Sequence, residues 1–206
     1  MKFKFYNEKS ILISELESQD ITGKSYQSCS ISPDMLEASK GLLTIKCAIP
    51  IIDIQGYWSP DMFRPAMQLA WKIEFNSAAH RNYPFLTFFN LAHKNRASIG
   101  LSNLHDDTVI CARMNQQTGN YDIEINVSIG KETGEFTIFL DQSDRKWTEI
   151  AADYRTFVRP DWKPDYPETA WLPVYCTWYT VHADLKKNWR EEQAETAAKI
   201  GFGTFI

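Results

Sequence analysis

Apolar and polar residues alternate strictly along two stretches of the chain. Residues 67–75 place apolar side chains at every second position, with Gln68, Lys72 and Glu74 between them, and residues 121–129 repeat the pattern. A period of two over nine residues buries one face of a strand and leaves the other in water. This pattern is typical of an antiparallel sheet with one solvated face.

Shorter apolar runs extend the pattern over the first two thirds of the chain. Met1–Phe5 alternates charged and aromatic residues, which indicates a strand rather than a signal peptide. Turn-forming residues at 118–120 and 131–134 separate later runs. Many short strands joined by turns predict an antiparallel β-sandwich over residues 1–143. The further expected strands are residues 42–49, 85–91, 97–101, 108–114 and 136–140.

The periodicity changes after Asp144. Apolar side chains from Trp147 to Val158 recur at helical spacing, which predicts an amphipathic helix. Three prolines follow between residues 159 and 170, and prolines at this density interrupt both helices and sheet ladders. We therefore expect residues 144–170 to form a helix and a stiff connector.

The last part of the chain reads as strand, helix, strand. Residues 171–179 are nearly all apolar, which suits a strand covered on both faces. The helix that follows carries Asn188 and Glu191 in capping-box spacing and ends before Gly201. Residues 203–206 begin a second apolar strand, so the segment predicts a parallel βαβ unit.

An isolated βαβ unit leaves the edges of its strands unpaired. We therefore expect either that the polypeptide continues into a larger domain or that another chain completes the sheet. The same exposed apolar surface predicts self-association, including a homo-oligomer.

Composition narrows the classes of partner. The net charge is -4 and no run of Lys and Arg occurs, which argues against nucleic acid. No stretch approaches the roughly 20 apolar residues of a membrane span. The four cysteines are widely spaced, as expected of free thiols in the reducing cytoplasm. The four histidines lack the spacing of a zinc site, so we expect no metal and no cofactor.

Residues 173–206 carry a distinctive motif. Thr177-Trp178 ends the first expected strand, and the helix ends in Ala197-Ala198 followed by Gly201. This segment resembles the first strand, first helix and second strand of the catalytic barrel in α-galactosidases of glycoside hydrolase family 36, the melibiase type. Members with the longer motif have Asn before the Thr and Glu after the Trp, where this chain has Cys176 and Tyr179.

The resemblance implies both a fold and an activity. The fold is a supersandwich-type β-sandwich followed by the opening β-α-β of a (β/α)₈ TIM barrel, here residues 171–206 and truncated. The activity is retaining, exo-acting hydrolysis of terminal α-linked galactose from oligosaccharides, with one Asp as nucleophile and another as acid and base. In the family these aspartates lie on later strands. The chain therefore contributes no catalytic residue, and alone it is expected to be inactive.

Sugar binding is what the resemblance assigns to this chain. Trp178 and Tyr179 occupy the C-terminal end of the first barrel strand, where functional groups of barrels gather. Aromatic rings pack against the C–H face of a sugar. The family's sandwich also lends a loop tryptophan to the barrel mouth, and the Gly- and Pro-bounded segment 55–60 offers Trp58 and Tyr57 for this role.

Other interpretations remain open at this point. Trp178 also suits the barrel interior, and the segment around Trp58 also suits packing on its own sandwich. The acidic groups at 105–107 and 141–144 lie in predicted turns, where Asp is favoured for local hydrogen bonds, so we expect no catalytic or calcium site there.

The functional alternatives also differ in class. A non-catalytic carbohydrate-binding or scaffold β-sandwich module would use the same aromatic residues, although the βαβ segment favours the enzyme. A parent enzyme acting on α-N-acetylgalactosaminides, or transferring galactose to another sugar, fits the same residues.

Overall fold

The computed structural model divides the chain into two compact units, Met1–Asp161 and Trp162–Ile206, which are described separately below. Residue placements are described for 1–60, 70–77, 82–161, 165–177 and 186–205.

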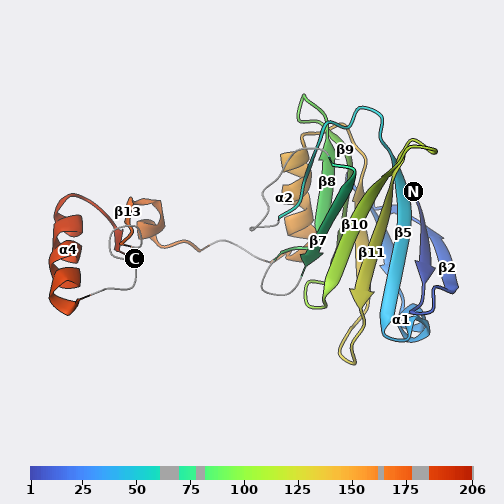
Figure 1. The fold of residues 1–206 in the computed structure, drawn as a ribbon, viewed down its shortest axis with the longest axis horizontal. Helices are drawn as coiled ribbons and strands as arrows, with labels where there is room; N and C mark the ends of the chain where they lie inside the picture. Colours follow the sequence, from blue (N-terminus) through green and yellow to red (C-terminus); the bar gives the residue numbers. More distant parts are fainter. Residues whose placement is uncertain (61–69, 78–81, 162–164, 178–185, 206) are drawn as a thin grey trace. The chain divides into compact units, whose positions relative to one another are not determined.

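The first unit contains two six-stranded sheets in which neighbouring strands pair antiparallel (Figure 1). The β5 sheet has the order β2 (Leu12–Glu17), β1 (Lys2–Tyr6), β5 (Leu42–Pro50), β11 (Asn120–Ser128), β10 (Thr108–Asn115), β7 (Lys72–Ser77). The β8 sheet has the order β3 (Gln19–Asp20), β4 (Gln27–Ile31), β12 (Phe136–Asp141), β9 (Asn95–Leu101), β8 (Phe85–Phe89), β6 (Gly56–Trp58).

Strand β11 shows why the alternating pattern forms a sheet. Ile123 and Ile125 are buried, whereas Asp122 and Glu124 lie on the opposite face. The prediction for residues 121–129 is therefore confirmed apart from its last residue, which follows the strand.

The other alternating stretch is confirmed only in its second half. Strand β7 begins at Lys72, with Ile73 and Phe75 buried and Glu74 exposed between them. Trp71 precedes the strand and is 64% exposed. The expected positions 67–69 lie outside the described residues.

One apolar core joins the two sheets. The inward side chains of both sheets belong to a single buried cluster, which includes Phe5 and Ile45 from the β5 sheet and Phe88 from the β8 sheet. Tyr121 crosses this layer, because its ring stacks on Phe88 at 4.9 Å and its hydroxyl donates to the Ala70 carbonyl at 2.8 Å. The first unit is thus mainly β, with two antiparallel sheets arranged as expected for a β-sandwich.

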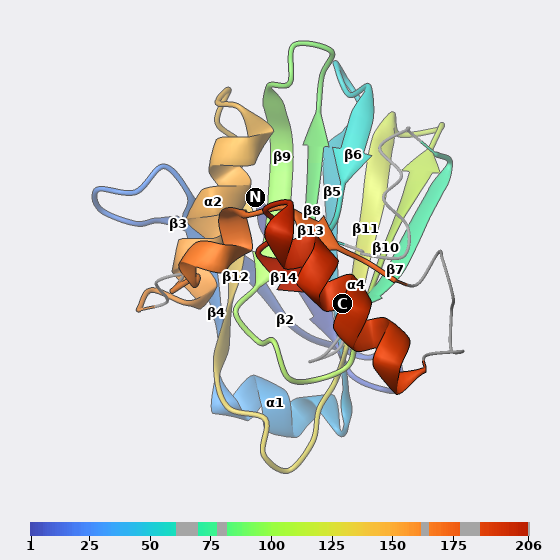
Figure 2. The ribbon, with the colours of Figure 1, turned by 90° about the vertical axis from the view of Figure 1, so that its left-hand side faces the viewer.

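Helix α2 (Trp147–Val158) has the bounds that its periodicity predicts and covers the outer face of the β8 sheet (Figure 2). The Tyr154 hydroxyl donates to the Leu101 carbonyl at 2.7 Å. Gly100 makes this close packing feasible, since a Cβ there would lie 2.5 Å from the Tyr154 ring. The sequence groups this helix with the connector, whereas in the structure it packs onto the sandwich.

The pattern does not predict several short elements. These include β2, β4 and β6 as well as the helix α1 (Pro33–Ser39), which has proline in its first turn. Such short elements give too few patterned positions to stand out from a loop.

The second unit contains the expected strand, helix and strand. Strands β13 (Val174–Tyr175) and β14 (Thr204–Phe205) pair in parallel, and helix α4 (Lys187–Lys199) lies between them in sequence. A 3-10 helix (Glu168–Trp171) precedes them. The described strands and the helix α4 of this unit therefore follow one another in βαβ order.

Two local predictions for this unit fare differently. Gly201 has φ +94° just after the helix, as a left-handed C-terminal position requires. The capping-box prediction is wrong, because Asn188 lies inside the helix and the N-cap is Lys186, which makes no side-chain capping bond.

The first apolar run of this unit forms less strand than its pattern predicts. Only Val174–Tyr175 is extended within residues 171–177, and Trp171 ends the 3-10 helix. Pro173 lacks the N–H that a ladder needs, which limits the strand on that side. Val174 is 48% exposed, so the expected cover on both faces is absent from this unit as described by itself.

Candidate functional site

Trp58 and Tyr57 lie in a strand rather than at the tip of a loop. They belong to β6, the edge strand of the β8 sheet, where Tyr57 pairs with Phe88 and Trp58 with Thr87. The Gln55 N–H also donates to the Phe89 carbonyl at 3.0 Å. The loop prediction for residues 55–60 is therefore wrong for 56–58, because a distant strand, β8, supplies the pairing.

Trp58 packs on helix α2 and on the neighbouring strand. Its ring centroid lies 5.3 Å from that of Trp147 and 6.2 Å from that of Phe85. The side chain is half-buried. These contacts favour the interpretation in which the segment packs on its own sandwich.

Tyr57 lies on the other side of β6. It is half-buried and packs against the core between the two sheets. Burial raises the pKa of the nearby Tyr121, and Tyr57 adds to this rise. Because the alternation of β6 sends them to opposite sides of the sheet, Tyr57 and Trp58 do not form one stacking surface.

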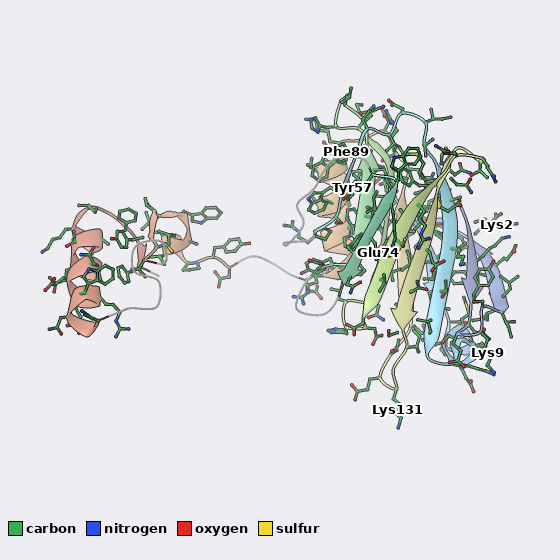
Figure 3. All side chains as sticks on the ribbon, viewed as in Figure 1. Lys2, Lys9, Tyr57, Glu74, Phe89 and Lys131 are labelled. Carbon is green, nitrogen blue, oxygen red and sulfur yellow. The ribbon has the colours of Figure 1, made fainter. Side chains whose placement is uncertain are left out.

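A row of three neighbouring aromatic rings marks this end of the β8 sheet. Phe89 stacks on Trp147 at 5.3 Å with 21° between the rings, and Trp58 lies on Trp147 in turn. We call Trp58, Trp147 and Phe89 the aromatic row; Phe89 and Tyr57 mark its neighbourhood in Figure 3. The sequence pattern assigns Trp147 to the apolar face of a helix, and its part in this row depends on contacts with separate strands.

The aromatic row suits packing or binding rather than bond cleavage. The buried indole N–H of Trp147 has no hydrogen-bond partner among the described residues. The rings provide apolar faces, and such faces bind the C–H surface of a sugar or pack against other rings.

Trp178 and Tyr179, the barrel residues to which the sequence assigns sugar binding, lie outside the described residues. The structure places the preceding Thr177 as a buried residue just after β13.

The acidic clusters are held by local partners. Asp106 accepts hydrogen bonds from Asn103 Nδ2 at 2.6 Å and from Thr133 Oγ1 at 2.8 Å. Hydrogen bonds from Arg96 and Lys94 lower the pKa of Asp144. These contacts suit the turn role that the sequence predicts.

Buried Asp141 has a structural role that ties α2 to the sheet. It pairs with Arg145 at 3.0 Å, and Arg145 also reaches Asp153 on the helix at 2.7 Å. The Ser143 hydroxyl donates to the same carboxylate at 2.6 Å.

The described residues contain no group of three or more His, Cys, Asp or Glu side chains placed to hold a metal ion. None of their helices combines the length and apolar character needed to cross a bilayer. All four cysteines are free thiols, and burial raises the pKa of Cys29 to about 11 and of Cys47 to about 12.

Comparison with known proteins adds no relative: no protein-family model matches the chain, and no curated protein matches it.

Proposed function

We propose that this chain is the N-terminal part of a retaining, exo-acting α-galactosidase, and that its catalytic aspartates come from barrel strands in a longer polypeptide. In this proposal the first unit is the β-sandwich and the second unit opens the catalytic barrel. The chain itself provides structure and substrate contacts but no nucleophile.

The observation that carries this proposal is the parallel pairing of β13 with β14 around helix α4. Val174 pairs with Thr204, and Tyr175 pairs with Phe205. A strand, helix and parallel strand is the repeating element of a (β/α)₈ barrel. Its position after two antiparallel sheets gives the order of domains that the motif in residues 173–206 implies.

Details of this unit suit a strand pair in close contact with its connections. Gly203 lies against Leu172, where a Cβ would come within 2.5 Å of that side chain. The Tyr175 ring stacks on Phe205 at 5.5 Å, and its hydroxyl donates to Gln193 Oε1 of α4 at 3.0 Å. Aromatic stacking thus joins the two strands, and a hydrogen bond joins β13 to the helix.

The proposed roles of Trp178 and Tyr179 follow from their place in the chain. They come shortly after the C-terminal end of β13, the end at which barrels place their functional groups. One ring would stack on galactose while a phenol or indole hydrogen bonds to a hydroxyl. The two carboxyl groups that carry out the double displacement would come from later strands of the barrel.

The test is an assay of the full-length protein beside the present chain. The full-length protein should release nitrophenol from p-nitrophenyl α-galactoside, and the chain alone should release none. Hydrolysis of the α-glucoside without the galactoside, or turnover by the chain alone, would contradict the proposal. Release from the α-N-acetylgalactosaminide, or transfer to a second sugar, would reassign the substrate within the same barrel chemistry.

A matched pair of tryptophans locates the contact. In the full-length protein, Trp178→Ala should raise KM about 10-fold or more, which corresponds to about 1.4 kcal/mol of binding free energy. Trp171→Ala removes the same side chain from a site that is 77% exposed and should leave KM unchanged. Equal effects of the two changes would remove Trp178 from the substrate site.

A further inference from the structure

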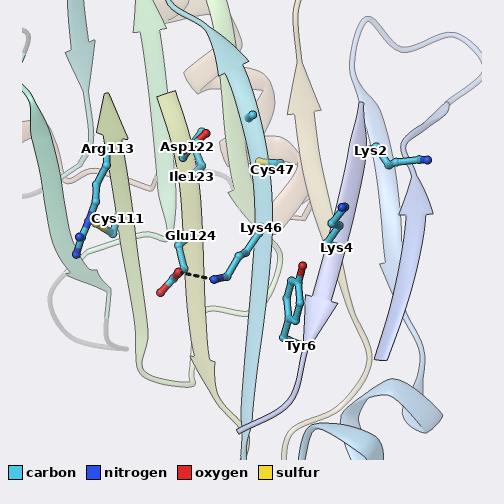
Figure 4. Close-up of a pocket in the computed structure, with 11 residues that line it drawn as sticks. Lys2, Lys4, Tyr6, Lys46, Cys47, Cys111, Arg113, Asp122, Ile123 and Glu124 are labelled. Carbon is cyan, nitrogen blue, oxygen red and sulfur yellow. Dashed lines mark hydrogen bonds and ion pairs between the residues drawn. The ribbon is translucent and has the colours of Figure 1, made fainter. Parts of the chain in front are cut away.

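A hollow of about 580 Å³ opens on the solvent face of the β5 sheet (Figure 4). Residues of β1, β5, β11 and β10 line it, and we call it the β5 hollow. The aromatic row belongs to the other sheet, the β8 sheet, so the two sites are separate. The volume falls within the range of about 300–1,000 Å³ that is usual for small-molecule sites.

The strand pairing explains why the hollow exists. Strand β1 pairs with β5 only from Lys4↔Lys46 to Tyr6↔Thr44, although β5 continues to Pro50. Figure 4 shows the two strands diverging beyond Lys4 and Lys46.

Two small side chains of β5 line the hollow, Ala48 on the solvent face of the strand and Cys47 on the side that packs against the core. Ala48 is exposed there and leaves room between longer neighbours. Cys47 is half-buried, although Ile45 and Ile49 on the same strand are almost completely buried. The hollow therefore reaches into the plane of the sheet between β1 and β5.

Charged side chains of both signs line the hollow in neighbouring pairs. Lys46 Nζ lies 3.0 Å from Glu124, and Arg113 stands opposite Asp122 in the β10–β11 register. Hydrogen bonding by Asn126 and the ion pair with Lys46 lower the pKa of Glu124, so it is ionised at neutral pH.

The two lysines of β1 share one carboxylate. Lys2 and Lys4 both approach Glu15, at 3.7 and 3.5 Å. Tyr6 adds one aromatic ring, with the Lys46 ammonium 5.3 Å from its centroid. Four cationic and two acidic side chains line the hollow, and each of its three lysines lies within 4 Å of a carboxylate. The hollow therefore offers donors, acceptors and a ring.

This chemistry selects a class of ligand. An anion needs cations that are not already paired with carboxylates, and an apolar ligand needs a lining without charged groups. A sugar hydroxyl donates and accepts at once, so alternating carboxylates and cations satisfy it on both sides. We propose that the β5 hollow binds a short neutral oligosaccharide.

This proposal does not rest on the proposed galactosidase activity. Sugar binding by the chain without hydrolysis would support the hollow, whereas nitrophenol release tests the barrel. A negative result in one of these two experiments leaves the other proposal unaffected.

The test is calorimetric titration of the chain with two neutral trisaccharides, raffinose and maltotriose, and with inorganic phosphate. We expect a dissociation constant of about 0.1–1 mM for at least one trisaccharide, since an open and solvated site gains little net free energy. Phosphate should bind more weakly.

Two pairs of variants locate the binding. Ala48→Arg fills the hollow and should weaken binding about 10-fold or more, which corresponds to about 1.4 kcal/mol. Asn76→Arg adds the same side chain to an exposed site on β7, on the same face, and should leave binding unchanged. Asp122→Ala should likewise weaken binding, with Asn76→Ala as its control. Melting temperatures of all four variants establish that they fold.

Binding of neither trisaccharide would overturn the proposal, as would tighter binding of phosphate. Equal weakening by Ala48→Arg and Asn76→Arg would also overturn it, because the sugar site would then lie elsewhere. Weakening by the two hollow variants alone would establish the site.

Discussion

The two sheets of the sandwich have opposite outer faces. The outer face of the β8 sheet carries Phe85 and Phe139 and lies under helix α2. The outer face of the β5 sheet carries ion pairs such as Lys46–Glu124, and its charged side chains remain accessible. One outer face is therefore an extension of the core, whereas the other remains accessible to a ligand.

Removal of the helix contact should have the largest effect on this contrast. Tyr154 is 3% exposed and lies 4.5 Å from Phe85 in a stacked arrangement. Tyr154→Ala should lower the free energy of unfolding by about 3–5 kcal/mol, as for other buried aromatic side chains. Urea denaturation measures this change.

Tyr154→Phe is the matched control, because it keeps the ring and removes the hydrogen bond to the Leu101 carbonyl. It should cost about 1 kcal/mol. A loss below 1 kcal/mol for Tyr154→Ala would show that α2 is not part of the core.

A smaller cost should follow from crowding the same contact. Gly100→Ala would place a Cβ 2.5 Å from the Tyr154 ring, and buried rings have little room to move. We expect a loss of about 1–3 kcal/mol in the free energy of unfolding.

A double-mutant cycle isolates the cause of that loss. In the Tyr154→Ala background the cost of Gly100→Ala should largely disappear, since the clashing ring is gone. An unchanged cost in both backgrounds would assign the effect to the backbone of β9 instead.

Trp58→Ala should have an intermediate effect. The ring packs on Trp147 and Phe85 but is half-buried, so we expect a loss of about 1–2 kcal/mol in the free energy of unfolding. The dissociation constant of the trisaccharide should be unchanged. Weaker binding with unchanged stability would place the sugar on the aromatic row.

The smallest effect should come from the open face. Lys46→Ala removes an ion pair whose two side chains are 48% and 43% exposed. We expect a loss of about 0.5 kcal/mol or less, because solvent screens such pairs. A loss comparable to that of Tyr154→Ala would mean that this face is covered in solution.

The sequence predicts those parts of the fold in which each residue's environment follows from its neighbours along the chain. The β11 alternation and the helical spacing of α2 are of this kind, and both elements form as expected. Residues 85–91 also predict a strand, but all five residues of β8 are buried because α2 covers its outer face. That burial depends on a distant element and cannot be read locally.

The candidate sites depend still more on distant contacts. The sequence pattern predicts a loop at Trp58 because its partner strand, β8, lies far along the chain. The β5 hollow combines four strands, and only their register brings Arg113 opposite Asp122 and Lys46 opposite Glu124. The polar positions of β11 could have indicated a wet face, although not where it is hollowed.

The contrast between the two outer faces is tested most directly by mapping raffinose binding on the isotopically labelled chain through amide chemical shifts. We expect the shifted amide signals to cluster in β1, β5, β11 and β10 around Ala48, and the signals of β6 and α2 to remain unshifted. Shifts confined to β6 and α2, around Trp58 and Trp147, would contradict it.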